Sequence, residues 1–150
     1  MNLSPEVHAA VQRDLWLLAE GDLDGQPIEV RFRPELRRAA DVSGYPELIV
    51  INWKYETDEF GMPTESALDE VDDFEDVLLT ALESDCHTVL AAVITNNGQR
   101  QWALYSSNVD EAGQRISTMP HKEKRYPIEL LTDHDENWVY VRENLLGNAA

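Results

Sequence analysis

Residues 94–105, ITNNGQRQWALY, decide the predicted fold because they contain the signature of a tight β-hairpin. The pair Asn97-Gly98 is the dipeptide that best tolerates positive φ at both central positions of a type I′ turn. Residues 88–96 and 99–106, which flank this pair, are rich in apolar, β-branched and aromatic side chains. The sequence therefore predicts two antiparallel strands joined at this turn.

The two-residue turn fixes the register of the hairpin and so the face on which each side chain lies. Val93 is expected to oppose Trp102 on one face. Leu90 is expected to oppose Tyr105 on the other face. Trp102 is therefore predicted in the core, whereas Tyr105, with more mixed neighbours, is predicted to contact a partner at the surface.

The segment before the hairpin predicts a strand followed by a long helix. Residues 45–55 alternate as a strand does, and the side chains expected on its core face are Ile49, Ile51, Trp53 and Tyr55. Thr64 is a predicted helix N-cap. The apolar residues after it recur at helical spacing and are expected to face the core: Leu68, Val71, Phe74, Leu78 and Leu82.

The segment after the hairpin repeats the order of helix and strand. Residues 109–119 predict a weaker helix that is interrupted by Gly113 and stopped by the proline that follows. Residues 126–130 predict a last strand, whose proline favours either an edge position in the sheet or a position at the start of the strand. Residues 135–146 are expected to form a short helix that carries Trp138.

From residue 45 onward, the order of strand, helix, strand, strand, helix, strand is that of the ferredoxin-like, split βαβ fold. We expect one α+β domain over residues 1–150, with an N-terminal extension (1–44), a βαββαβ core (45–132) and a C-terminal helix or tail (133–150). Both core helices should lie on one face of the antiparallel sheet. The open face is too apolar to remain bare, so the N-terminal segment or a second copy in a homodimer should cover it.

The N-terminal extension is expected to begin with a helix. Ser4 offers a capping hydroxyl and Pro5 is already fixed at a helical φ. Apolar residues then recur at helical spacing as far as Leu18. The end of this helix stays open, because residues 15–20 could instead pair with residues 28–32 as a hairpin.

The charge of the chain narrows its expected partners. Twelve Lys and Arg against 29 Asp and Glu give a formal net charge of −17, whose field repels nucleic-acid backbones and anionic membranes. No segment approaches the roughly 20 apolar residues of a membrane-spanning helix, and the N-terminus does not resemble a signal peptide. Cys86 is the only cysteine, so no internal disulfide can form. We expect a cytoplasmic protein.

The strongest compositional feature is the acidic run over residues 56–76, in which ten of 21 residues are acidic and none is basic. Like charges at successive turns destabilise a helix by a few tenths of a kcal/mol each, so the run has a cost. The acids expected to point away from the core are Glu65, Asp69, Asp72, Asp73 and Asp76. With Tyr105 they form the predicted partner-binding face, and the alternative is that they serve solubility alone.

No motif predicts a catalytic residue, a cofactor site or a metal site. Residues 20–25 resemble the start of a calcium loop, but Arg31 stands at its twelfth position, where a glutamate is needed. Asp133-His-Asp-Glu136 places an imidazole among three carboxylates, without a second histidine three or four residues away. The basic cluster at residues 121–125 is expected to form internal ion pairs or a solvated loop.

Several pieces of the sequence together resemble a bacterial family known as domain of unknown function 695: GYPELIVINWKYETDEFGMPT, DFED, ITNNGQRQWALYS, and YPIEL with a downstream Asp and Trp. The resemblance covers roughly residues 16–140. This family is similar in predicted fold to the regulator of ribonuclease activity B proteins, which are acidic ferredoxin-like inhibitors. The similarity implies a regulatory binding role and supplies no catalytic residues.

The function expected from the sequence is that of a non-enzymatic, regulatory interaction module. Its acidic helix would engage a protein partner with a basic surface, such as a nucleic-acid enzyme or a basic toxin. The alternative is a small hydrolase or a metal-dependent enzyme with a site near His134. A stoichiometric transition metal in the native purified protein would favour the enzyme.

Overall fold

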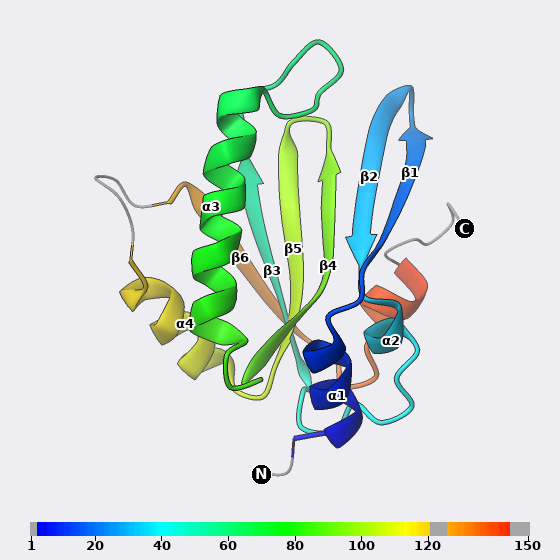
Figure 1. The fold of residues 1–150 in the computed structure, drawn as a ribbon, viewed down its shortest axis with the longest axis vertical. Helices are drawn as coiled ribbons and strands as arrows, with labels where there is room; N and C mark the ends of the chain where they lie inside the picture. Colours follow the sequence, from blue (N-terminus) through cyan, green and yellow to red (C-terminus); the bar gives the residue numbers. More distant parts are fainter. Residues whose placement is uncertain (1–2, 121–125, 145–150) are drawn as a thin grey trace.

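The computed structural model describes residues 3–120 and 126–144, without the side chains of Leu23 and Asn144. Its class is α+β, because one six-stranded antiparallel sheet packs against helices on both of its faces (Figure 1). Within the described ranges, no helix is both long enough and apolar enough to cross a membrane.

The strands lie in the order β1-β2-β4-β5-β3-β6, and every neighbouring pair is antiparallel. Their bounds are β1 (Leu17–Leu23), β2 (Gln26–Phe32), β3 (Glu47–Lys54), β4 (Thr88–Asn96), β5 (Gln99–Ser106) and β6 (Ile128–His134). The described helices are α1 (Pro5–Arg13), α2 (Pro34–Arg37), α3 (Glu65–Leu82), α4 (Val109–Thr118) and the π-helix η1 (Tyr140–Asn144).

The turn between β4 and β5 is the predicted one. Asn97 and Gly98 have φ angles of 47° and 85°, as both central residues of a type I′ turn require. Val93 opposes Trp102, and Trp102 is fully buried, so this part of the predicted register is confirmed.

A β-bulge between Leu90 and Ala92 shifts the register farther from the turn. Val89, instead of the predicted Leu90, opposes Tyr105. Leu90 consequently packs in the same core cluster as Val93, on the helix-covered face. The prediction for Leu90 is wrong because one extra residue in a strand moves the residues beyond it to the other face.

The face of the sheet covered by α3 and α4 holds the larger aromatic cluster. Thr64 caps α3 as predicted, and its hydroxyl accepts a hydrogen bond from the Ala67 amide. The buried stripe of α3 meets the predicted core face of β3 in this cluster: Val71, Phe74, Leu78 and Leu82 against Ile49, Ile51, Trp53 and Tyr55. Leu68 was expected in the stripe but is 36% exposed. It lies in the first turn of α3, and the buried residues of the helix begin one turn later, at Val71.

The weaker predicted helix is unbroken, although an interruption was expected in it. α4 runs through Gly113 without a break and ends at Thr118, two residues before Pro120. Met119 is extended, with φ −67° and ψ 155°, as the residue before a proline prefers. The glycine therefore weakens the helix without dividing it.

The N-terminal extension joins the sheet at one edge and covers part of its second face. α1 ends at Arg13, where Asp14 turns into the left-handed region with φ 51°. A helix that continues to Leu18 is thus wrong, and the hairpin alternative is correct, because β1 pairs with β2. β2 in turn pairs with β4, while side chains of α1 and α2 pack on the second face of the sheet. Coverage by a second copy in a homodimer stays a prediction.

The C-terminal part returns to the same face. β6 is an edge strand, as predicted, but it extends to His134, beyond the predicted end at residue 130. Trp138 follows it and is fully buried, just before η1. The predicted helix is therefore shorter where it is described, and the end expected at residue 146 lies outside the described residues.

Candidate partner-binding surface

α3 carries acidic side chains in two different surroundings. The inner acids, which bind arginines on the sheet side of the helix, are Asp72, Glu75 and, just beyond the helix end, Glu83. The outer acids, which point away from the sheet, are Glu65, Asp69 and Asp76. Asp73 is also exposed, and it has an interaction partner, which sets it apart from the outer acids.

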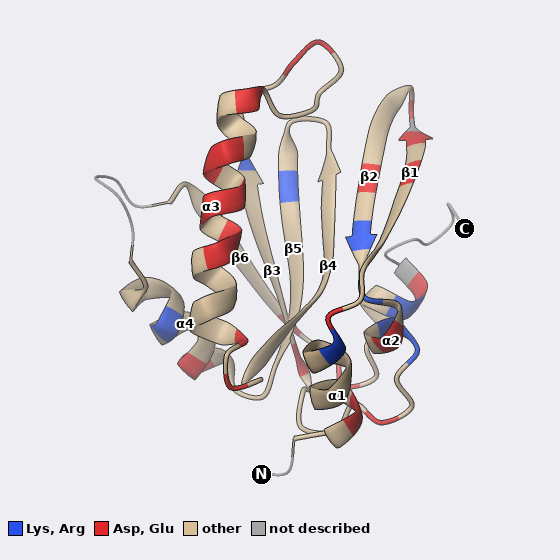
Figure 2. Cartoon of the chain, in the orientation of Figure 1, with Lys and Arg blue, Asp and Glu red and all other residues tan. Residues whose placement is uncertain are grey.

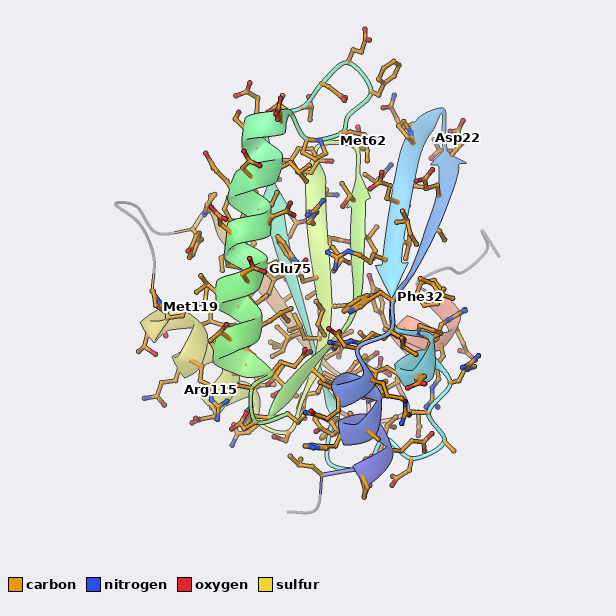
Figure 3. All side chains as sticks on the ribbon, in the orientation of Figure 1. Asp22, Phe32, Met62, Glu75, Arg115 and Met119 are labelled. Atoms are coloured by element: carbon orange, nitrogen blue, oxygen red, sulfur yellow. The ribbon has the colours of Figure 1, made fainter. Side chains whose placement is uncertain are left out.

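Glu75, which is labelled on α3 in Figure 3, connects the middle of this helix to two strands. Its Oε1 atom accepts hydrogen bonds from Arg31 Nη2 of β2 at 2.6 Å and from Trp102 Nε1 of β5 at 2.8 Å. The Glu75 side chain is only 13% exposed, so its charge needs these donors. This carboxylate therefore fixes the position of α3 along the strands and its rotation about its own axis.

Arg100 adds a second connection one turn away. Its guanidinium donates to Asp72 Oδ1 at 3.2 Å and to Thr95 Oγ1 at 2.9 Å. The arginine side chain is 7% exposed, whereas the aspartate is 58% exposed. Asp72 is thus at the surface, as predicted, but it is already paired.

Arg33 holds the C-terminal end of α3. It donates to both carboxylate oxygens of Glu83, at 2.6 and 2.8 Å, and to Asp14 Oδ1 at 2.7 Å. Burial works against the charge of Arg33, but the two carboxylates outweigh it and raise the arginine pKa. The ring of Trp16 lies against this guanidinium and that of Arg31, with centroid distances of 4.6 and 5.1 Å.

The outer acids are all exposed. Figure 2 shows that acidic positions recur along α3 and that no basic position interrupts them. Within residues 3–120 and 126–144, no hydrogen bond or ion pair engages the side chains of Glu65, Asp69 or Asp76. The inner acids, in contrast, all have arginine partners. The outer acids therefore present negative charge that no arginine of the described residues compensates.

Tyr105 does not belong to this surface. Its side chain is fully buried, its ring stacks on Trp138, and its hydroxyl donates to Asp135 Oδ2 at 2.7 Å. Burial, with the Asp135 carboxylate, raises the tyrosine pKa. The prediction that Tyr105 contacts a partner is wrong because the C-terminal segment covers this end of the sheet face.

A shallow groove of about 620 Å³ runs between α3 and α4, on the side of α3 away from β2. At one end Arg115 donates to both oxygens of Asp85 at 2.9 Å, and to Glu111 at 3.1 Å. Hydrogen bonding to Arg115 lowers the pKa of Asp85 to about 2. Asp76 lines the groove, so the groove meets the outer acids.

The residues around His134 do not converge on a common point. His134 Nδ1 lies 3.1 Å from Glu47 Oε1, and this hydrogen bond raises the histidine pKa. Asp133 accepts the backbone N–H of His134, and Asp135 turns inward to accept the Val139 amide. Among the described residues, no three His, Cys, Asp or Glu side chains are grouped so as to hold a metal ion.

The remaining sequence candidates lie elsewhere. Cys86 is 1% exposed, and burial raises the pKa of its thiol. Residues 20–25 comprise the end of β1 and the turn of the β1–β2 hairpin, in which Asp24 and Gly25 have φ angles of 52° and 83°. The basic cluster at residues 121–125 lies outside the described residues.

The pairing of the inner acids with arginines was not predicted from the sequence. The sequence contains a weak signal for this pairing. Arg31 and Arg33 alternate with the apolar Val30 and Phe32, and a long acidic run follows later in the sequence. Alternation alone assigns such residues to solvent. Only the pairing of β2 with β4 brings them beside α3.

Comparison with known protein families gives a match. The family model described as a family of unknown function, DUF695, covers residues 14–146. This chain belongs to the DUF695 family. No curated protein and no solved structure matches it. The match therefore gives the family of this DUF695 protein, and the description of that family names no function.

Proposed function

We propose that this DUF695 protein is a non-enzymatic interaction module that binds a basic surface of another protein through the outer acids of α3. The observation that carries the proposal is the contrast between the two groups of acids on one helix. Each inner acid has an arginine partner within the fold, whereas Glu65, Asp69 and Asp76 have no such partner among the described residues. A structural role accounts for the first group and not for the second.

The cost of this arrangement supports the proposal. Glu65 and Asp69 are four residues apart, as are Asp72 and Asp76. Each such pair of like charges destabilises the helix by roughly 0.2–0.5 kcal/mol. A basic partner relieves this repulsion on binding, and the field of a chain with net charge −17 accelerates its approach.

The rigidity of α3 supports the proposal as well. Glu75 and Glu83 connect the helix to β2 and β5 before any partner arrives. The outer acids therefore stand on a fixed element, and binding does not pay the entropy of ordering a helix.

The finer assignments are part of the same proposal. We infer that the core of β3 to β6 with α3 and α4 is ferredoxin-like, supported by the order β4-β5-β3-β6 with all pairs antiparallel. The likeness to acidic inhibitors of ribonuclease activity then favours a regulatory role in the cytoplasm. The single buried cysteine is compatible with that location.

Capture from native lysate tests the proposal. The test variant carries Glu65→Gln, Asp69→Asn and Asp76→Asn, which remove three charges that no described ion pair uses. The control carries Glu20→Gln, Asp22→Asn and Asp24→Asn, three exposed acids of the β1–β2 hairpin. Both variants change the net charge by the same amount.

We expect the wild type and the control to retain the same partner at about 0.1 M salt and to lose it towards 1 M, where the Debye length falls from about 10 Å to about 3 Å. The α3 variant should fail to retain it at either salt concentration. Identical capture by all three proteins would refute the proposal and leave solubility as the role of the acids.

A further inference from the structure

The groove between α3 and α4 has an apolar floor. Val77 and Ala81 of α3 and Met119 at the end of α4 form it, and Met119 and Arg115 lie beside α3 in Figure 3. Thr80, an exposed residue, stands on its border. The volume of about 620 Å³ is ample for bulky side chains of another molecule.

The rim of the groove is acidic. Asp76 is both an outer acid and a lining residue, so the apolar floor continues into the acidic side of α3. At the other end, Arg115 is shared by two carboxylates, those of Asp85 and Glu111. The groove and its surroundings therefore hold three carboxylates and one guanidinium, and Asp76 has no described partner. An anionic occupant is therefore disfavoured, and a cationic one is favoured.

We infer that this groove receives a bulky apolar side chain of a basic partner segment, while lysines or arginines of that segment bind Asp76 and the other outer acids. The inference rests on the proposed function and adds the chemistry of the partner. Protein interfaces commonly combine an apolar centre with a charged rim, and the centre supplies most of the binding energy. Charge alone would give a fast but weak encounter.

Defined peptides provide the test. The first probe is a fluorescent 14-residue peptide of leucine and lysine, with the leucines at helical spacing so that they share one face. A second probe has every leucine replaced by serine, and a third has every lysine replaced by glutamine. Anisotropy titrations at low salt should show that the wild type binds the leucine–lysine peptide at least about tenfold more tightly than either of the others.

Two neighbouring residues of α4 offer matched variants. Thr118 lines the groove between α3 and α4, and Ser117 lines an adjacent groove toward β6 that shares only Met119 with the first; both residues are exposed. Thr118→Trp should fill the groove and abolish the preference for leucine over serine. Ser117→Trp should leave that preference unchanged. Circular dichroism verifies that both variants fold.

A measurement on the unmodified protein guards against misfolded variants. In methyl-labelled wild type, the leucine–lysine peptide should shift the NMR signals of Val77, Ala81 and Met119. Unshifted signals at these residues would overturn the inference, as would a leucine preference that survives Thr118→Trp.

The two proposals fail in different ways. If both lysine peptides bind with equal affinity and both weaken in the Glu65, Asp69 and Asp76 amide variant, the proposed function stands and the groove is not its anchor. If the leucine preference persists but that variant and the glutamine peptide bind as tightly as the originals, the groove is a plain apolar site and both proposals are wrong.

Discussion

The indole of Trp138 stacks on the phenol ring of Tyr105, with ring centroids 4.2 Å apart and ring planes inclined by 9°. Trp138 Nε1 donates to the Tyr45 carbonyl at 3.0 Å, and the Tyr105 hydroxyl donates to Asp135. The segment after β6 is thereby fastened to β5 and to the start of β3. Tyr105 is a structural residue whose contacts join distant parts of the chain.

Tyr105→Phe should lower the free energy of unfolding by roughly 1.5–3 kcal/mol, because it removes a buried hydrogen bond to a carboxylate. Urea denaturation followed by circular dichroism measures the change. Tyr126→Phe is the control, since the Tyr126 hydroxyl makes one exposed bond of 3.3 Å to Pro120 and should contribute about 0.5 kcal/mol or less. Equal losses in the two variants would contradict a special role for the Tyr105 hydroxyl.

Gly98→Val should destabilise the fold by about 1–3 kcal/mol, because a β-branched residue resists the φ of 85° at this turn. A Cβ here would also approach Thr57 Cγ2 to 3.4 Å. Asparagine tolerates positive φ, so Gly98→Asn should lower the free energy of unfolding by clearly less than Gly98→Val does. Thermal unfolding distinguishes the two variants. If Gly98→Val has the same melting temperature as the wild type, backbone strain at this turn is not important.

The ion pair of Asp85 with Arg115 should make stability depend on acid pH. The folded pKa of Asp85 is about 2, below the ordinary value of 3.8, so the pair stabilises above about pH 4 and its contribution is lost as the pH falls through 2. Because the Asp85 side chain is 56% exposed, the effect should stay below about 1 kcal/mol.

Urea unfolding of the wild type and of Asp85→Asn at several values from pH 5 to pH 2 checks this expectation. The difference in unfolding free energy between the two proteins should shrink as the pH falls. A constant difference over this window would show that the carboxylate charge is not responsible.

Arg33→Ala should be among the most damaging single changes, at about 3–5 kcal/mol, because it leaves the 11% exposed Glu83 side chain without its cation. Arg33→Lys should restore only part of the loss, since an ammonium cannot bind both Glu83 oxygens and Asp14 in the same fork. Arg38→Ala, at an exposed arginine of the same segment, is the control and should stay within about 0.5 kcal/mol. Denaturant titration measures the unfolding free energy of all three variants. A loss for Arg33→Ala as small as that for Arg38→Ala would show that the Arg33–Glu83 pair is not important for stability.

Local patterns predicted the elements that local physics determines. The Asn97-Gly98 turn, the Thr64 cap and the buried stripe of α3 depend on backbone angles and on side-chain periodicity within a few residues. The same reasoning correctly placed Tyr105 and Trp102 on opposite faces of the sheet. It failed to predict burial of Tyr105, because the covering Trp138 comes from a segment some 30 residues later.

Other features depend on contacts that no short window contains. The bulge beside Ala91 has no turn or glycine signature, so the register prediction passed through it unaltered. The outer acids were predicted from helical periodicity. The arginine partners of Asp72 and Glu75 were not, because they come from β5 and β2 and depend on the order of strands in the sheet.

The strand order also has a consequence for synthesis of the chain. β3 lies between β5 and β6, and both of these strands follow it in the sequence. β4, which is one neighbour of β2, likewise follows β2 in the sequence. A nascent chain that has completed α3 therefore carries β3 without either of its neighbours, and β2 paired with β1 alone. Such non-local pairing is slow, and exposed strand edges invite aggregation. We expect this protein to fold only after most of it has left the ribosome, and to depend on chaperones that shield β2 and β3 until then.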